Sequence, residues 1–84
     1  MRWLKDIPHE RYKISIFQYN GKYIVKIELA QFEQIFKIND TDVNSLEELE
    51  RMVNNDLLSN SLKRFVSMRE DWQNSFQRKN KIDE

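Results

Sequence analysis

Residues 12–29 read YKISIFQYNGKYIVKIEL, two runs of alternating side chains that meet at Asn20-Gly21. Asn-Gly readily takes the positive φ angles of a type I′ turn, so it predicts a two-residue β-hairpin. Counting outward from this turn pairs apolar residues on one face: Ile16 with Val25, Ile14 with Ile27 and Tyr12 with Leu29. The same register sets Lys13 opposite Glu28 on the other face, and a one-residue slip would destroy both matches.

A third antiparallel strand is predicted over residues 31–39, where apolar side chains again alternate. If Ala30-Gln31 is a tight turn, the apolar face continues across three strands: Leu29 faces Phe32, Val25 faces Phe36 and Tyr23 faces Ile38. Ala-Gln is poor turn chemistry, however, and this register sets Glu28 opposite Glu33. A longer loop or a bulge is therefore an alternative connection.

Two helices are predicted after the strands. Ser45 and Glu48 form a capping box that indicates a helix from about Leu46, and Asn44 with Glu47 offers a start one residue earlier. The run at 54–56, Asn-Asn-Asp, ends this helix and caps a second one, because these residues favour local side-chain to backbone hydrogen bonds.

The second helix is expected from Leu57 to about Lys79, with one broad apolar stripe: Leu58, Leu62, Phe65, Val66, Met68, Trp72 and Phe76. At ~1.5 Å per residue it would be about 34 Å long, against about 26 Å for an eight-residue strand. Either the N-terminal residues or another chain must therefore cover Trp72 and Phe76.

The whole chain, residues 1–84, is expected to form a single small α+β domain. Its predicted architecture is a three-stranded antiparallel β-meander with two C-terminal helices packed on one face, in the order βββαα. Residues 1–10 are expected to be an N-terminal arm laid across the core, because Pro8 biases Ile7 towards an extended conformation. Residues 80–84 are expected to be a mobile polar tail.

Composition excludes several classes of function. Fourteen basic and fourteen acidic residues cancel, so no global field favours phosphates or basic partners, and the absence of cysteine removes disulfides and thiolate chemistry. Charge interrupts the first residues before an apolar leader could form, and no run approaches the ~18 apolar residues of a membrane span. We expect a cytoplasmic protein without a membrane segment.

Catalytic and cofactor machinery is also missing from the sequence. The segment 40–44 imitates the start of a calcium-binding EF-hand loop, but Ser45 stands where the loop needs Gly and Arg51 where it needs Glu. His9 is the only histidine and has no evident catalytic ally, and Gly21, the only glycine, is used by the hairpin turn. The chain is therefore predicted to be non-enzymatic, without a cofactor, a metal or catalytic residues.

Large side chains in two places predict an interaction surface. On the face of the hairpin away from the helices, apolar residues interrupt the polar pattern that a solvated sheet should show. Either the N-terminal arm or a partner chain must cover them. Together with the far end of the long helix, they form the candidate interface: Phe17, Tyr19, Ile24, Ile35, Trp72 and Phe76. We expect a protein-protein interaction module that forms a homodimer or binds another protein.

Nucleic-acid binding is the alternative function. Exposed aromatic residues on a sheet can stack single-stranded bases, and basic residues can neutralise phosphates. The aromatic group is Phe17, Tyr19 and Tyr23, and the basic group of the last helix is Lys63, Arg64, Arg69, Arg78, Lys79 and Lys81. Glu70 and Asp71 interrupt the basic group, so this alternative is not favoured.

Overall fold

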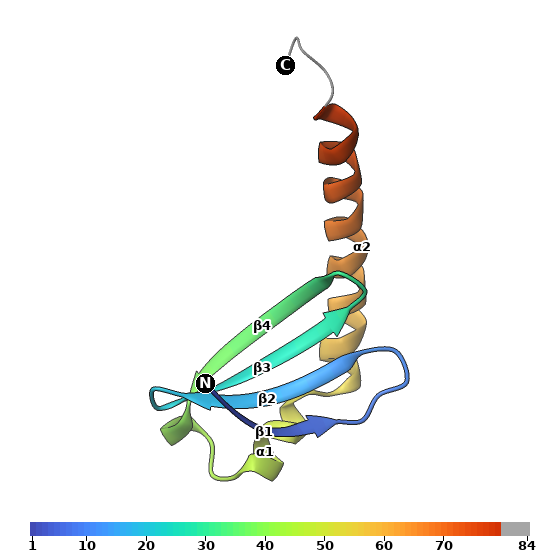
Figure 1. Cartoon of the computed structure of the whole chain (residues 1–84). Helices are drawn as coiled ribbons and strands as arrows, with labels where there is room; N and C mark the ends of the chain where they lie inside the picture. The colour runs from blue at the N-terminus through green and yellow to red at the C-terminus, as the bar shows by residue number, and fades with distance from the viewer. Residues whose placement is uncertain (80–84) are drawn as a thin grey trace.

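The computed structural model describes residues 1–79, which form a four-stranded antiparallel sheet and two α-helices (Figure 1). The strands β1 (Arg2–Ile7), β2 (Lys13–Tyr19), β3 (Lys22–Leu29) and β4 (Phe32–Asn39) lie side by side in chain order. A short 3-10 turn, η1 (Asp40–Asp42), leads to α1 (Leu46–Met52) and α2 (Asn55–Arg78). The α+β class and the meander order are confirmed, whereas the predicted count of three strands is wrong. The mobile tail predicted at 80–84 lies outside the described residues.

The central hairpin has the predicted turn and register. Asn20 and Gly21 have φ angles of 52° and 73°, as a type I′ turn requires. Across the two strands, Lys13 lies opposite Glu28, and the pairs Ile14 with Ile27 and Ile16 with Val25 share the opposite face.

The β3–β4 connection is the tight two-residue turn, and not a longer loop or a bulge. Leu29 pairs with Phe32 across it. Ala30 takes a φ of 56°, and this left-handed conformation has a free-energy cost for an L-residue that carries a side chain. The like charges of Glu28 and Glu33 do lie opposite each other, and Lys26 offsets their repulsion because its Nζ lies 3.8 Å and 3.6 Å from their carboxylate oxygens.

The residues predicted to form an N-terminal arm instead contain an additional strand, β1, at one edge of the sheet. It pairs antiparallel with β2, with Trp3 opposite Phe17 and Ile7 opposite Ile14. The register shifts between Trp3 and Lys5, and such a bulge breaks the alternation of side chains by which a strand is recognised in a sequence. After the strand, His9 Nδ1 accepts the backbone N–H groups of the two residues that lead into β2, at 3.0 Å and 3.2 Å.

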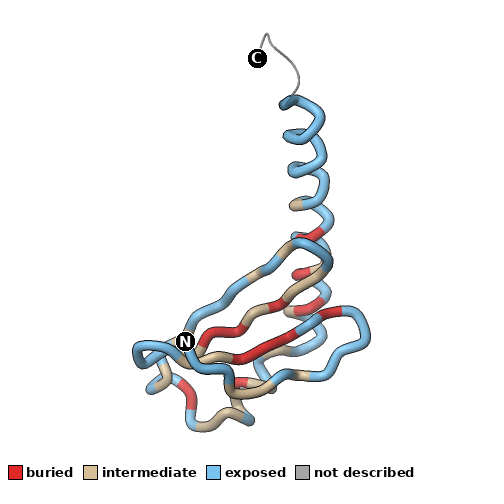
Figure 2. The backbone as a smooth tube through the Cα atoms, viewed as in Figure 1, coloured by how far each residue is buried: buried red, intermediate tan, exposed pale blue. Residues whose placement is uncertain are grey.

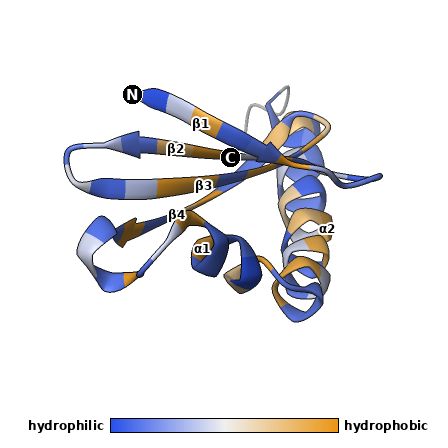
Figure 3. Ribbon diagram, turned by 90° about the horizontal axis from the view of Figure 1, so that it is seen from below, coloured by the Kyte–Doolittle hydropathy of each residue, from blue (hydrophilic) through white to orange (hydrophobic). Residues whose placement is uncertain are grey.

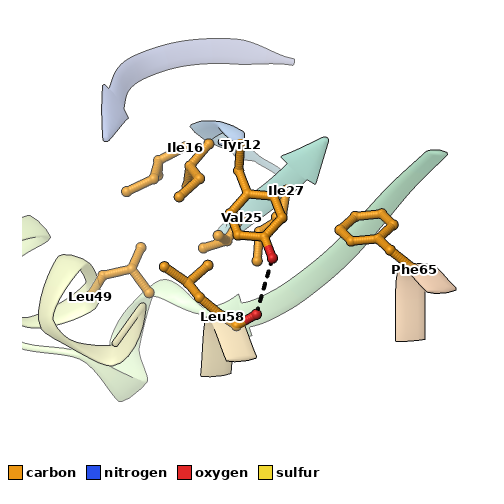
Figure 4. Close-up of a cluster of buried hydrophobic side chains, with 8 residues drawn as sticks. Tyr12, Ile16, Val25, Ile27, Leu49, Leu58 and Phe65 are labelled. Atoms are coloured by element: carbon orange, nitrogen blue, oxygen red, sulfur yellow. Dashed lines mark hydrogen bonds between the residues drawn. The ribbon is translucent and has the colours of Figure 1, made fainter. Parts of the chain in front are cut away.

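Helix α1 begins at Leu46 after the predicted cap, whereas α2 begins at Asn55, two residues before the predicted start, because Asn54 is the residue of the predicted capping run that caps it. Ser45 Oγ accepts the N–H of Glu48 at 3.1 Å, and Asn54 Oδ1 accepts the N–H of Leu57 at 2.9 Å. The helices pack on the same face of the sheet, α1 beside β4 and α2 at the end where β3 and β4 are joined (Figure 3). The core between these layers is drawn in Figure 4 and consists of eight buried residues: Tyr12, Ile14, Ile16, Val25, Ile27, Leu49, Leu58 and Phe65.

Helix α2 crosses the sheet from β2 towards β4 and continues past the β4 edge (Figure 1). Near its start, Tyr12 Oη donates to the carbonyl of Leu58 at 3.3 Å. Further along, Gln34 of β4 donates to the carbonyl of Ser61 at 2.9 Å and lies beside Met68 Sδ at 4.0 Å. A helix of 24 residues is about 36 Å long, and its last turns project beyond the sheet (Figure 1).

Candidate interaction surfaces

The projecting part of α2 carries the largest exposed side chains of the predicted interface. Every residue of α2 from Arg69 to Arg78 is exposed (Figure 2). Trp72 is 57% exposed and Phe76 is 61% exposed. The ammonium group of Lys79 lies 4.8 Å from the centre of the Phe76 ring. We name Trp72 and Phe76 the α2 tip.

The α2 tip continues the line of side chains by which α2 packs on its own sheet. Leu58 and Phe65 are buried in the core, seven residues apart, and Trp72 follows after the same interval. Since side chains at such intervals share one face of a helix, the core face and the tip form one stripe. The stripe changes from buried to exposed only because the sheet ends beneath it.

The outer face of the sheet offers less surface than its sequence suggests. Phe17 and Ile24 lie opposite each other as predicted, but Ile24 is only 7% exposed. Lys26 lies on the same face, and its Nζ is 5.2 Å from the centre of the Phe17 ring. Tyr19 and Ile35 are the two predicted residues of this face that remain exposed, at 53% and 50%.

Strand β1 widens this outer face and does not cover it. Trp3 lies next to Phe17 on the outer side, whereas Leu4 and Ile7 pack against the core. The indole N–H of Trp3 donates to Asp6 Oδ1 at 2.9 Å, and this bond, with a hydrogen bond from the Ser15 side chain, lowers the pKa of the Asp6 carboxyl. Sequence reasoning placed Trp3, Leu4 and Ile7 in an arm that could cover this face, and it missed that Trp3 belongs to a strand that extends the face.

A second exposed apolar area lies on the helix side of β4. Phe36 of β4 and Met52 of α1 are both exposed, and a cavity of about 270 Å³ lies between their elements. The guanidinium of Arg64 lies 5.9 Å from the Phe36 ring centre and donates to Gln34 at 2.8 Å. The alternation of β4 assigned Phe36 to the core, but an edge strand is covered on one side only. We name Phe36, Ile38 and Met52 the β4 groove.

His9, the histidine of the sequence, is hydrogen-bonded to the backbone of its own loop. A surface cavity of about 550 Å³ lies beside His9, between the β1–β2 loop and the start of α2. His9 Nδ1 already accepts two backbone N–H groups, and its ring lies 4.9 Å from that of Tyr12. Among residues 1–79, no group of three His, Cys, Asp or Glu side chains is placed to hold a metal ion. In the same residues, no helix has the length and apolar character needed to cross a membrane.

The residues proposed for nucleic-acid binding do not form one surface. Phe17 and Tyr19 lie on the outer face of the sheet, while Tyr23 lies on the helix side, opposite Ile38. The described basic residues lie along α2, which packs on the helix side and then projects past the sheet, or at its C-cap. Arg64 is already hydrogen-bonded to Gln34 and Ser61, and Lys81 lies outside the described residues.

No protein-family model, curated protein or solved structure matches this chain. The class of protein is therefore defined by its fold and its surfaces: a small antiparallel meander backed by two helices, one of which projects beyond the sheet.

Proposed function

We propose that this chain is a non-enzymatic protein-protein interaction module that associates with a second copy of itself. The observation that carries the proposal is the exposure of the α2 tip. Trp72 and Phe76 continue the core stripe of α2 beyond its own sheet, at 57% and 61% exposure. Aromatic residues of this kind dominate the energy of protein interfaces when a partner buries them.

A second copy is the simplest partner for such a stripe. Closed twofold dimers are the commonest symmetric assemblies, and each copy contributes the same patch to the interface. A stable interface buries roughly 1,200 Å² or more in total, which the α2 tip alone does not supply. The tip therefore requires neighbouring surface, and the β4 groove lies on the same side of the sheet.

Light scattering with size-exclusion chromatography tests the proposal. We expect the full chain at high micromolar concentration to have the mass of two chains. Trp72→Ser together with Phe76→Ser should give the mass of one chain, because it removes both aromatic anchors from the surface. Asn74→Ser is the matched control, an exposed change on the opposite side of the same helical turns.

Circular dichroism should show that both variants keep their helix content, since these side chains contact little of their own chain. A wild-type protein that is strictly monomeric at high micromolar concentration would overturn the proposal. So would an unchanged dimer in the double variant.

Nucleic-acid binding remains the alternative prediction from another class. It is less favoured because Phe17 and Tyr19 lie on the face of the sheet away from α2, while Arg64 of α2 lies on the other face beside Phe36. Titration of mixed single-stranded oligonucleotides at increasing salt separates the two functions, because phosphate contacts make affinity fall steeply with salt concentration.

A further inference from the structure

Strand β4 presents a regular edge. It is the last strand of the sheet, eight residues long, and pairs with β3 without a register shift. It contains no Pro or Gly. The opposite edge, β1, is interrupted by its bulge. Natural proteins usually block a long straight edge, because its free backbone groups are a template for another strand.

The hydrogen-bonding pattern shows which residues of β4 face outward. The N–H of Asp40 donates to the carbonyl of Gly21 at 2.9 Å, in line with the β3–β4 ladder. In an antiparallel ladder such bonded positions recur at every second residue. Phe36 therefore directs its backbone groups to β3, whereas Glu33, Ile35 and Lys37 direct theirs to the open edge.

We infer that β4 pairs antiparallel with β4 of a second copy, about a twofold axis at Ile35, and so joins the two sheets into one. This inference rests on the proposed self-association and names its geometry. With Ile35 opposite itself, Glu33 lies opposite Lys37 of the second copy, and Lys37 lies opposite its Glu33. Both side chains are exposed on the outer face, where opposite charges on facing strands stabilise pairing.

The charge pattern selects this register over the other symmetric ones. An axis at Glu33 would set two carboxylates opposite each other, and an axis at Lys37 would set two ammonium groups opposite each other. Like charges directly opposite destabilise strand pairing. Axes at Gln34 and Phe36 set no like charges opposite each other, but they set Ile35 opposite Glu33 or opposite Lys37 and leave both charges without an opposite partner. Among the axes at residues 33–37, the one at Ile35 alone sets Glu33 opposite Lys37, and it also brings the exposed apolar side chain of Ile35 against its own copy.

The same symmetry accounts for the α2 tip. Because α2 continues past the β4 edge on the helix side, strands added at that edge must lie over its projecting turns (Figure 1). Helix α2 passes the sheet beside Phe32, which lies opposite Ile38 of the second copy in this register. Trp72 and Phe76 of one copy are therefore carried towards the β4 groove of the other.

Cysteine cross-linking tests the register, since the chain has no cysteine of its own. Under mild oxidation, Ile35→Cys should form a reducible covalent dimer, because directly opposite residues lie about 5.5 Å apart between Cα atoms. Lys37→Cys is the control on the same strand, compared at a concentration where light scattering shows that it is still a dimer, because the change also removes the charge that faces Glu33. Its two copies would lie four residues apart, about 13 Å along the strand, beyond the ~7 Å limit for a disulfide.

A charge exchange tests the same geometry without a covalent bond. Glu33→Lys and Lys37→Glu should each raise the dissociation constant of the dimer at least about tenfold relative to the wild type, because each sets like charges opposite each other. Mixed in equal amounts, the two variants should form a heterodimer, since every facing pair is then of opposite charge. Any local effect of losing the Lys26–Glu33 ion pair is present before and after mixing.

The outcomes separate this inference from the proposed function. A wild-type dimer that gives no Ile35→Cys cross-link, or variants that do not recover on mixing, would refute the β4 pairing and leave self-association standing. Cross-linking of Lys37→Cys as fast as Ile35→Cys would refute the register. A wild-type monomer would refute both proposals.

Discussion

Exchanges between glycine and alanine in the two hairpin turns should have opposite effects on the free energy of unfolding. Gly21 has a φ of 73°, and a Cβ added there meets no atom within 4 Å. Gly21→Ala therefore costs only backbone free energy. The left-handed conformation costs an L-residue about 1–2 kcal/mol, offset by about 0.4–1 kcal/mol from the stiffer unfolded chain, so we expect a loss of about 1 kcal/mol.

Ala30→Gly should reverse that balance. Ala30 already sits at a φ of 56°, so glycine relieves the same backbone cost, and we expect a gain of about 1 kcal/mol in the free energy of unfolding. For a domain of this size, about 1 kcal/mol corresponds to roughly 4–8 °C in the melting temperature. Gln31→Gly is the control, because Gln31 does not have positive φ and glycine there should only destabilise.

Urea and thermal unfolding followed by circular dichroism measure all three changes. If Ala30→Gly destabilises the protein as Gln31→Gly does, Ala30 is not in a left-handed conformation and the tight β3–β4 turn is wrong. The register of β4, and the edge that it presents, would then have to be reassigned.

Two further changes test single hydrogen bonds. Tyr12→Phe removes the buried donor to the Leu58 carbonyl at 3.3 Å and should lower the free energy of unfolding by about 1–2 kcal/mol, measured by urea unfolding; a change below about 0.3 kcal/mol would contradict it. Trp3→Phe removes the first cause of the lowered Asp6 pKa and should raise that pKa in an NMR titration. The folded pKa of Asp6 lies below the unfolded one, so the stabilisation from Asp6 is present above the unfolded pKa and is lost as pH falls through the folded pKa. The variant should therefore lose less stability in acid. An unchanged Asp6 pKa in the variant would argue against the bond.

Signals confined to a few neighbouring residues predicted most of the fold. Asn20-Gly21 determines a turn through its own φ angles, and Ser45 and Asn54 cap helices through bonds to residues three positions away. Once the turn is known, period-two alternation determines the register of β2 and β3. Each of these causes acts over a short stretch of chain and can therefore be read from the sequence alone.

The candidate surfaces were predicted only in part, because exposure depends on what the rest of the chain covers. The sequence identified Trp72 and Phe76, since a helix longer than the sheet must leave its end uncovered. It treated Ile24 as exposed and Phe36 as core, yet neighbouring side chains close over Ile24 while Phe36 stands at an edge. No local pattern distinguishes a central strand from an edge strand.

The edges of the sheet were decided by tertiary structure. The bulge in β1 hid the alternation by which its residues could have been recognised, and only pairing with β2 makes Arg2–Ile7 a strand. The pairing covers β2 on both sides, whereas β4, the last strand of the predicted meander as well, stays a regular open edge. Whether a strand stays at an edge depends on all the long-range pairings together, and for that reason the sequence alone did not reveal that β1 covers β2.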